Sequence, residues 1–285
     1  MANVRTIRRQ IRGVQNIAKI TRAMEMIATS KMRRAQEAGL AGRPYAELIT
    51  RVLADLAGLE ESGRELHPLL QRRPVKRIAL VHITPDRGLC GGLHSSLNRN
   101  LASFILKQPV PTSLIMVGRK GLDFARRNRQ DIRAEFTRMS DRPSLLDTLP
   151  ISRIIIDDYT SGQFDQVYLS YARFVSTTVQ RPILQPVLPI EPASAEPGVS
   201  LDYIYEPEPA AVLSALLPRF VEMLVYHAVL EAIASEQSAR VVAMRNATDN
   251  ANELIQSLTL TYNKVRQETI TTELLDIAGG AAALG

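Results

Sequence analysis

A glycine-rich turn follows the first short apolar run in the middle of the chain, and its residue types could support chemistry. It reads Arg87-Gly-Leu-Cys-Gly-Gly92, and a helical pattern begins at Leu93. Backbone N–H groups in such a turn could bind an anion. However, the turn matches neither G-x-G-x-x-G nor G-x-x-x-x-G-K-[ST], and no lysine stands where a P-loop would direct one at phosphate. The pattern favours a tight strand-to-helix turn at an interface over a nucleotide site, and no cofactor is expected.

Cys90 is the only cysteine of the chain, and it lies in this turn. A nucleophilic thiol needs an adjacent base that a third group holds in place. His82 and His94 are near in sequence, but these residues around one turn do not make an active site, so ordinary packing of Cys90 is favoured. A single cysteine also excludes an intrachain disulfide and a four-cysteine zinc site. Asp157 and Asp158 have no second cluster of ligand-type residues, so we expect a hydrated surface there and no metal site.

The N-terminal segment is strongly basic. Residues 1–36 hold nine arginines and lysines against one acid, Glu25, whereas the stretch from Ala210 onward holds five basic and eight acidic residues. The formal net charge of +6 therefore lies mainly in one segment, and a partner is expected to contact that segment. The partner could be nucleic acid, but no aromatic residue interleaves the arginines and no nucleic-acid module is recognisable. The same charges could also mark a solvated helix face or bind a protein partner with acidic loops.

The composition favours a protein built largely from helices. Of the 285 residues, 45% are hydrophobic but only 5% are aromatic, and tryptophan is absent. Helices packed on small and aliphatic side chains fit this balance better than an aromatic-lined ligand pocket does. No apolar run reaches the ~20 residues that cross a bilayer, and no apolar run of a secretory signal follows the first arginines. Any membrane association is therefore expected to be peripheral.

Both ends of the chain have the pattern of long helices. An apolar stripe runs through residues 1–58, where Gly39, Gly42 and Pro44 mark a point at which the helix is expected to bend or break. A second stripe, rich in alanine, runs through residues 210–285. Alanine lets two helix axes approach closely, so we expect the segments to pair as an irregular antiparallel coiled coil. The stripe positions are Ile7, Ile11, Val14, Ile17, Met24, Ile27 and Met32, and then Leu224, Ala228, Ala232, Ala239, Val242, Ala247, Ala251, Leu254, Leu258 and Val265.

Residues 75–190 have a different sequence pattern, in which short apolar runs alternate with helical patterns. This alternation indicates βαβ units and a mostly parallel sheet. A proline-rich connector over residues 186–209 leads to the last helix. The expected fold is therefore a long antiparallel coiled coil of the N- and C-terminal helices with an inserted Rossmann-like α/β domain. Strands are expected at 77–84, 113–118, 132–137, 166–170 and 175–188, and helices at 93–106, 119–128 and 145–160.

Three segments resemble signatures of one family, the gamma subunit of F-type ATP synthases. The first is Lys19–Gln36, which reads KITRAMEMIATSKMRRAQ. The second is the turn at Arg87–Gly91, and the third is Tyr262–Ala281, which reads YNKVRQETITTELLDIAGGA. The segments occur in the family's order, so the resemblance covers both terminal helices and the domain between them.

The resemblance implies a mechanical function in a proton-driven rotary enzyme. The terminal helices would form the central-stalk shaft inside a hexamer of alpha and beta subunits, and the α/β domain would lie towards the epsilon subunit and the membrane ring of c subunits. Proton flow would turn ring and shaft together and drive the catalytic beta subunits through successive conformations. This chain would then have no catalytic, cofactor or metal site and no nucleic-acid partner. The family's motifs imply rotor–stator contacts at Met24, Lys31, Arg33, Arg34, Arg266, Gln267, Thr271 and Glu273, and a lower stalk contact at Arg87, Gly88, Leu89, Cys90 and Gly91.

This chain differs from some members of the family in a feature of redox regulation. Some chloroplast members carry a cysteine pair in an inserted loop, and this chain has one cysteine and no such insertion. With no targeting peptide visible, the resemblance implies a peripheral subunit on the cytoplasmic face of the bacterial inner membrane. The alternative is a stand-alone Rossmann-like binding protein with coiled-coil arms. Purification distinguishes the two, because a shaft should co-elute with alpha and beta subunits.

Overall fold

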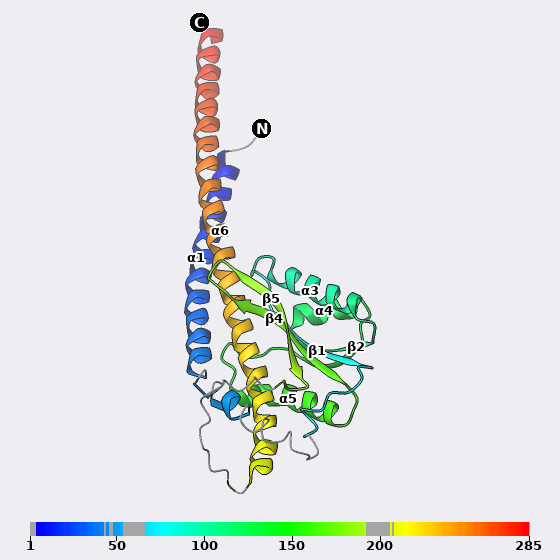
Figure 1. Cartoon of the computed structure of the whole chain (residues 1–285). Helices are drawn as coiled ribbons and strands as arrows, with labels where there is room; N and C mark the ends of the chain where they lie inside the picture. The colour runs from blue at the N-terminus through cyan, green and yellow to red at the C-terminus, as the bar shows by residue number, and fades with distance from the viewer. Residues whose placement is uncertain are drawn as a thin grey trace. The chain divides into compact units, whose positions relative to one another are not determined.

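A computed structural model describes residues 4–42, 44–45, 48–53, 67–191, 206 and 208–284. The chain divides into two compact units, residues 1–28 with 241–285 and residues 29–240. The first and last helices contribute residues to both units (Figure 1). The helices are α1 (Val4–Ala41), α3 (Leu93–Lys107), α4 (Arg119–Arg127), α5 (Leu145–Thr160) and α6 (Pro209–Leu284), and the strands are β1 (Ile78–Ile83), β2 (Thr112–Val117), β3 (Ile132–Phe136), β4 (Gln166–Phe174) and β5 (Gln180–Leu188).

The first unit is an antiparallel pair of helix segments from α1 and α6. The hydroxyls of Thr21 and Thr248 are hydrogen-bonded at 2.7 Å. One turn further along α1, Glu25 accepts a hydrogen bond from Arg245 Nε at 3.0 Å, one turn back along α6. The two helices therefore run in opposite directions, which confirms the predicted antiparallel pairing.

The buried seam of this pair is made largely of small side chains. Its α1 positions are separated by multiples of seven residues, and its α6 positions by three or four, as in coiled coils. Ile17 and Ile27 are 53% and 55% exposed, so the prediction that they belong to the buried stripe is wrong. Small residues occupy the seam because they let the axes approach, which leaves larger side chains at its margins. The buried residues are Ile7, Thr21 and Ala28 on α1 and Val241, Met244, Thr248 and Ala251 on α6.

The second unit contains a five-stranded sheet in the order β3-β2-β1-β4-β5. β1 pairs in parallel with β2 and β4, and β2 pairs in parallel with β3, while β5 is antiparallel to β4. The predicted Rossmann-like, mostly parallel sheet is confirmed. The last strand begins at Gln180 and not at Val175, because Val179 N–H bonds back to Ser176 O and residues 175–179 form the turn of a hairpin.

Alternate residues of the buried strands point to opposite faces of the sheet. On one face, Ala79, Val81 and Ile83 of β1 pack in a large core with α5 and α6. On the other face, Leu80 packs in a smaller core with α3 and α4. Figure 1 shows the helices α3 and α4 beside the sheet. Each face is thus covered by helices, which explains why β1 is buried at all six positions without alternation.

The first helix ends close to the predicted break. α1 stops at Ala41, and a Cβ atom on Gly42 would lie 2.6 Å from His227 Cε1, so a larger residue there requires the His227 ring to move. Residues 48–53 are helical again, with Ile49 and Leu53 in the large core. The rest of the predicted segment 1–58, after residue 53, lies outside the described residues, as does most of the connector 186–209.

The expectation about membrane-spanning segments needs correction. Within residues 209–279 of α6, an 18-residue window has a mean hydropathy of 1.4, which by length and composition suffices to cross a membrane. Leu213, Leu217, Val221 and Val225 of this helix are buried in the large core of the second unit. Burial in a protein core accounts for part of this apolar composition, because 39% of the window is buried.

Candidate functional site

The turn at Arg87–Gly92 connects β1 to α3 and has an unusual backbone. Leu89 has φ +64° and Gly91 has φ +60°, so both lie in the left-handed region. Glycine adopts that region freely, whereas a leucine there is disfavoured and uncommon. The Leu89 side chain is 60% exposed, while that of Cys90 is buried. The turn therefore presents an apolar side chain to solvent from a strained backbone.

Cys90 is a packing residue. Its side chain lies in a small cluster with Leu93, Leu97, Ala172 and Ala239. Among the described residues, the thiol has one hydrogen bond, to Arg87 O at 3.9 Å. Burial raises the pKa of the Cys90 thiol, and the nearby Glu236 carboxylate adds to this shift. A raised pKa disfavours the thiolate, which is the nucleophilic form.

His82 is fully buried and bonds to neighbours other than Cys90. Its Nδ1 lies 3.0 Å from Ser170 Oγ, and its Nε2 lies 3.1 Å from Asn98 Oδ1. A neutral ring that donates through Nε2 and accepts at Nδ1 satisfies both contacts. Burial lowers the pKa of His82 to about 4, and the hydrogen bond to Asn98 opposes this shift only partly. His82 thus links β1, β4 and α3 in neutral form and is no base for Cys90.

The neighbouring strand-to-helix turn, between β2 and α4, was not singled out in the sequence. Gly118 has φ +94°, and a Cβ atom there would lie 1.8 Å from Thr84 O. The N–H groups of Arg119 and Gly121 bond to Asp86 Oδ1 and Thr84 Oγ1. Side chains of the chain itself therefore occupy donors that an anion would use at a helix N-terminus.

A cavity of about 470 Å³ lies beside this turn, at the carboxyl ends of β1 and β2. Open α/β sheets bind ligands outside the carboxyl ends of their strands. Here α6 forms one wall, so the chain's own helix covers part of that position. The polar lining mixes both signs of charge, from Asp86, Arg87, Arg138, Asp141 and Glu236. No group of three or more His, Cys, Asp or Glu residues suited to a metal ion occurs in the described part of the chain.

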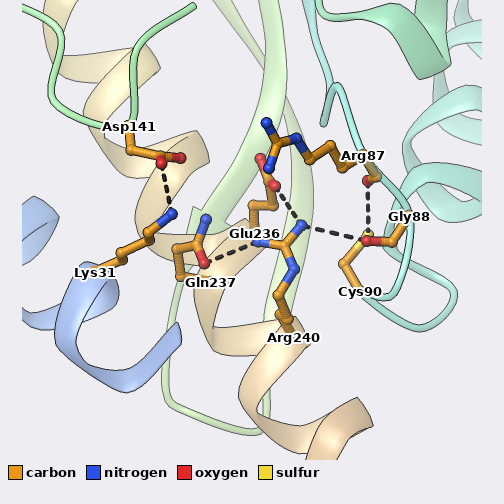
Figure 2. A network of polar contacts seen from close by, with 8 residues as sticks. All are labelled: Lys31, Arg87, Gly88, Cys90, Asp141, Glu236, Gln237 and Arg240. Carbon is orange, nitrogen blue, oxygen red and sulfur yellow. Dashed lines mark hydrogen bonds and ion pairs between the residues drawn. The ribbon is translucent and has the colours of Figure 1, made fainter. Parts of the chain in front are cut away.

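Arg240 of α6 is the centre of a polar network on the turn (Figure 2). Its guanidinium donates to Glu236 Oε1 at 2.6 Å, to Gln237 Oε1 at 2.8 Å and to the carbonyl oxygen of Gly88 at 3.3 Å. We call Gly88, Glu236, Gln237 and Arg240 the Arg240 cluster. Burial raises the pKa of Glu236, and the Arg240 charge counteracts this shift. The cluster ties the turn to α6, a link that sequence reasoning missed.

The predicted rotor–stator residues differ in exposure. Arg33, Arg34, Arg266, Gln267, Thr271 and Glu273 are exposed, whereas Met24 and Lys31 are half-buried. Lys31 Nζ bonds to Asp141 Oδ2 at 2.5 Å (Figure 2), so this cation already has a partner within the chain. Thr271 donates its hydroxyl to Gln267 O at 2.9 Å. Each of the two terminal helices thus carries some of the predicted contact residues.

The expectation of a hydrated surface at Asp157 and Asp158 is wrong for the second residue. Asp158 is buried and accepts two hydrogen bonds from Arg133, at 2.9 and 3.0 Å. This bidentate pair joins α5 to β3. A buried carboxylate needs such a partner, because leaving it unpaired is costly.

Comparison with known sequences finds one family along nearly the whole chain. A model of the family described as ATP synthase matches residues 3–284. The ATP synthase gamma chain of Dehalococcoides mccartyi strain CBDB1 is 66% identical over 284 residues, covering 100% of both chains. That of Roseiflexus castenholzii is 51% identical and covers 100% of this chain and 99% of its own length.

Solved structures with a similar fold come from ATP synthase rotors. A chain from the central stalk and c-ring structure of Tetrahymena thermophila mitochondrial ATP synthase has a TM-score of 0.63 and 25% identity, and the match covers 80% of this chain and 99% of that one. A chain from a Euglena gracilis mitochondrial ATP synthase structure has a TM-score of 0.65 at 20% identity, covering 99% and 94%, and supports the fold alone.

Proposed function

Since this chain belongs to the ATP synthase family and matches its gamma chains over their full length, we propose that it is the shaft of the central stalk. As such it is a subunit of a rotary enzyme, and it transmits rotation of the membrane ring to the catalytic subunits. The alternative of a stand-alone binding protein with helical arms is set aside, because the family match spans both terminal helices and the domain between them.

One observation supports this proposal above the others. Every described side chain from Arg266 to Gly279 of α6 is exposed, and these include Ile270, Leu274, Leu275 and Ile277. A concentration of exposed apolar side chains marks a surface that another protein covers. In the proposed function, the stator subunits that surround the shaft cover it.

The exposed polar residues of the same helix are the proposed coupling contacts. Arg266, Gln267, Thr271 and Glu273 on α6 would meet the moving loops of the beta subunits, and Arg33 and Arg34 on α1 would act likewise. Met24 and Lys31 belong to the same proposal. A partner carboxylate would have to compete with Asp141 for the Lys31 ammonium group.

The proposed partners follow from the same role. They are the alpha and beta subunits of the catalytic hexamer, the epsilon subunit and the ring of c subunits, with the Arg87–Gly91 turn as the lower stalk contact. The proposed location is peripheral, on the cytoplasmic face of the bacterial inner membrane. ATP chemistry would take place on the beta subunits, and this chain would contribute no catalytic group.

A reversible crosslink in the assembled complex tests the proposed function. An Arg266→Cys variant would be paired with a cysteine on a facing beta loop. A disulfide has an S–S length of about 2.0 Å, so it allows little sliding between its partners. Oxidation should then abolish steady ATP hydrolysis, and reduction should restore it. Cys90 can stay in place, because it is buried and its raised pKa disfavours the thiolate.

The control is the same complex without the beta cysteine, in which oxidation should change nothing. If crosslinking goes to completion and hydrolysis continues at its former rate, the chain is a static scaffold and the proposed function is wrong.

A further inference from the structure

The Arg87–Gly92 turn does not stabilise its own shape. Leu89 lies in the left-handed backbone region at φ +64°, and its side chain is 60% exposed, so little burial offsets the strain. A strained conformation of this kind persists only where surrounding groups enforce it. Strained residues of this kind also concentrate at functional contacts.

Two neighbours enforce the conformation of the turn. On one side of Leu89, the Cys90 side chain is buried in its apolar cluster with Ala239 of α6. On the other side, the carbonyl oxygen of Gly88 accepts a hydrogen bond from Arg240 Nη2. Both contacts are made with neighbouring residues of α6, Ala239 and Arg240, so this part of the helix sets the position of Leu89.

Arg240 is itself held in one orientation. Its side chain is 12% exposed, and that of its ion-pair partner Glu236 is 18% exposed. The guanidinium uses its planar set of donors on Glu236, Gln237 and Gly88 together. A lysine has a single ammonium group on a flexible stem and does not reproduce this geometry. The link from helix to turn therefore depends on arginine and not only on positive charge.

Building on the proposed function, we propose that Arg240 is a positioning residue that fixes the Arg87–Gly92 turn to α6, so that Leu89 and Arg87 form a contact surface that moves with the shaft helix. The surface suits a partner with an apolar recess for Leu89 and a carboxylate for Arg87, which is exposed and takes part in none of the ion pairs found among the described residues. Without Arg240 the turn deforms under load, and less of the helix's motion reaches the subunit that the turn contacts.

Hydrogen exchange in the assembled complex tests the positioning step. In Arg240→Ala and Arg240→Lys complexes, the amides of residues 88–92 should exchange about tenfold faster than in the wild type, since a local opening becomes easier. The matched control is Arg219→Ala, which removes an exposed ion pair with Glu222 on the same helix. The control should leave the exchange of the turn unchanged.

A second readout separates positioning from simple structural support. In membrane vesicles, the number of protons moved per ATP hydrolysed should fall roughly twofold or more in both Arg240 variants. Unchanged exchange in an assembled Arg240→Ala complex would overturn the inference, and so would faster exchange with normal pumping. If Arg240→Ala does not assemble, Arg240→Lys decides by the same two readouts. Failure of the proposed function is distinct, because it shows in the Arg266 crosslink on an otherwise wild-type chain.

Discussion

Two stretches of α6 differ in their relation to solvent although both are rich in apolar residues. Between residues 213 and 234 the helix supplies buried side chains such as Leu217 and Val225 to the core around the sheet. Between residues 266 and 279 every described side chain is exposed. The difference shows that hydrophobicity along one helix serves two purposes, folding in one stretch and association in the other. The two stretches differ in whether other elements of the chain pack against them, and not in their apolar composition.

The largest expected effect comes from placing a charge in the buried stretch, and an exposed position of α6 shortly before residue 266 serves as the comparison. Leu217→Asp puts a carboxylate into a fully buried site, and we expect a loss of about 5 kcal/mol or more in the free energy of unfolding. Leu260→Asp changes a side chain that is 73% exposed, and we expect a change within about 0.5 kcal/mol. Denaturant titration of the isolated chain measures both.

A large destabilisation by Leu260→Asp in the isolated chain would break the comparison. It would show that the distal part of α6 contributes to folding. If the comparison holds, the cost of Leu260→Asp should appear instead as weaker binding to the partner subunits.

Acid should weaken the sheet-containing unit selectively. The pKa of His82 is about 4 in the folded chain, below its ordinary value of 6.5. The folded state therefore resists protonation that the unfolded state accepts, and stability is lost as pH falls from about 6.5 to about 4. That interval corresponds to about 3 kcal/mol. Hydrogen exchange at a series of pH values, corrected for the intrinsic rate, should show this loss in residues 67–191.

His82→Gln is the matched variant for this prediction. The amide nitrogen of glutamine can replace His82 Nε2 as the donor to Asn98 Oδ1, and glutamine does not titrate in this range. The pH-dependent loss should therefore shrink by about 3 kcal/mol in the variant. An undiminished loss would assign the acid sensitivity to other groups.

The smallest expected effect concerns the helix pair. The hydroxyls of Thr21 and Thr248 are hydrogen-bonded to each other in the buried seam, and each also lies within donating distance of a carbonyl oxygen of its own helix. Replacing one of them by valine removes a hydrogen bond from the other, and we expect the free energy of unfolding to fall by about 1 kcal/mol. The double variant should cost less than the sum of the two single changes. A double-mutant cycle by thermal unfolding measures the coupling, and strict additivity would contradict it.

Most of the elements could be predicted because their signals are local. The helix α5 begins after Ser144, where the capping box between Ser144 and Asp147 satisfies free N–H groups at its start. The strands β1 and β2 are short apolar runs followed by glycine-containing turns, which single-sequence reasoning locates well. The seam of the helix pair was predicted less well, because Thr21 and Ala28 are less hydrophobic than the exposed Ile17 and Ile27.

The candidate site was only half predictable for a related reason. The glycines of the 87–92 turn indicate an unusual backbone conformation. Arg240, however, lies 152 residues after Gly88, and no rule of sequence spacing connects the two residues. The one available signal was the Glu236–Arg240 pair four residues apart on a helix, which indicates an ion pair and nothing about the turn. In the same way, sequence spacing could not show that Lys31 meets Asp141.

The edge strand β5 affects how the chain behaves before it assembles with its partners. Among the described residues, β5 pairs only with β4, and it carries Pro182 and Pro186, which lack the N–H group that a further strand would need. Exposed edges otherwise recruit other strands and lead to aggregation. At the β5 edge, a newly made subunit is therefore protected from pairing with the sheet of another copy while it waits for its partners. The protection of this edge depends on two residues that have no role in the proposed coupling contacts.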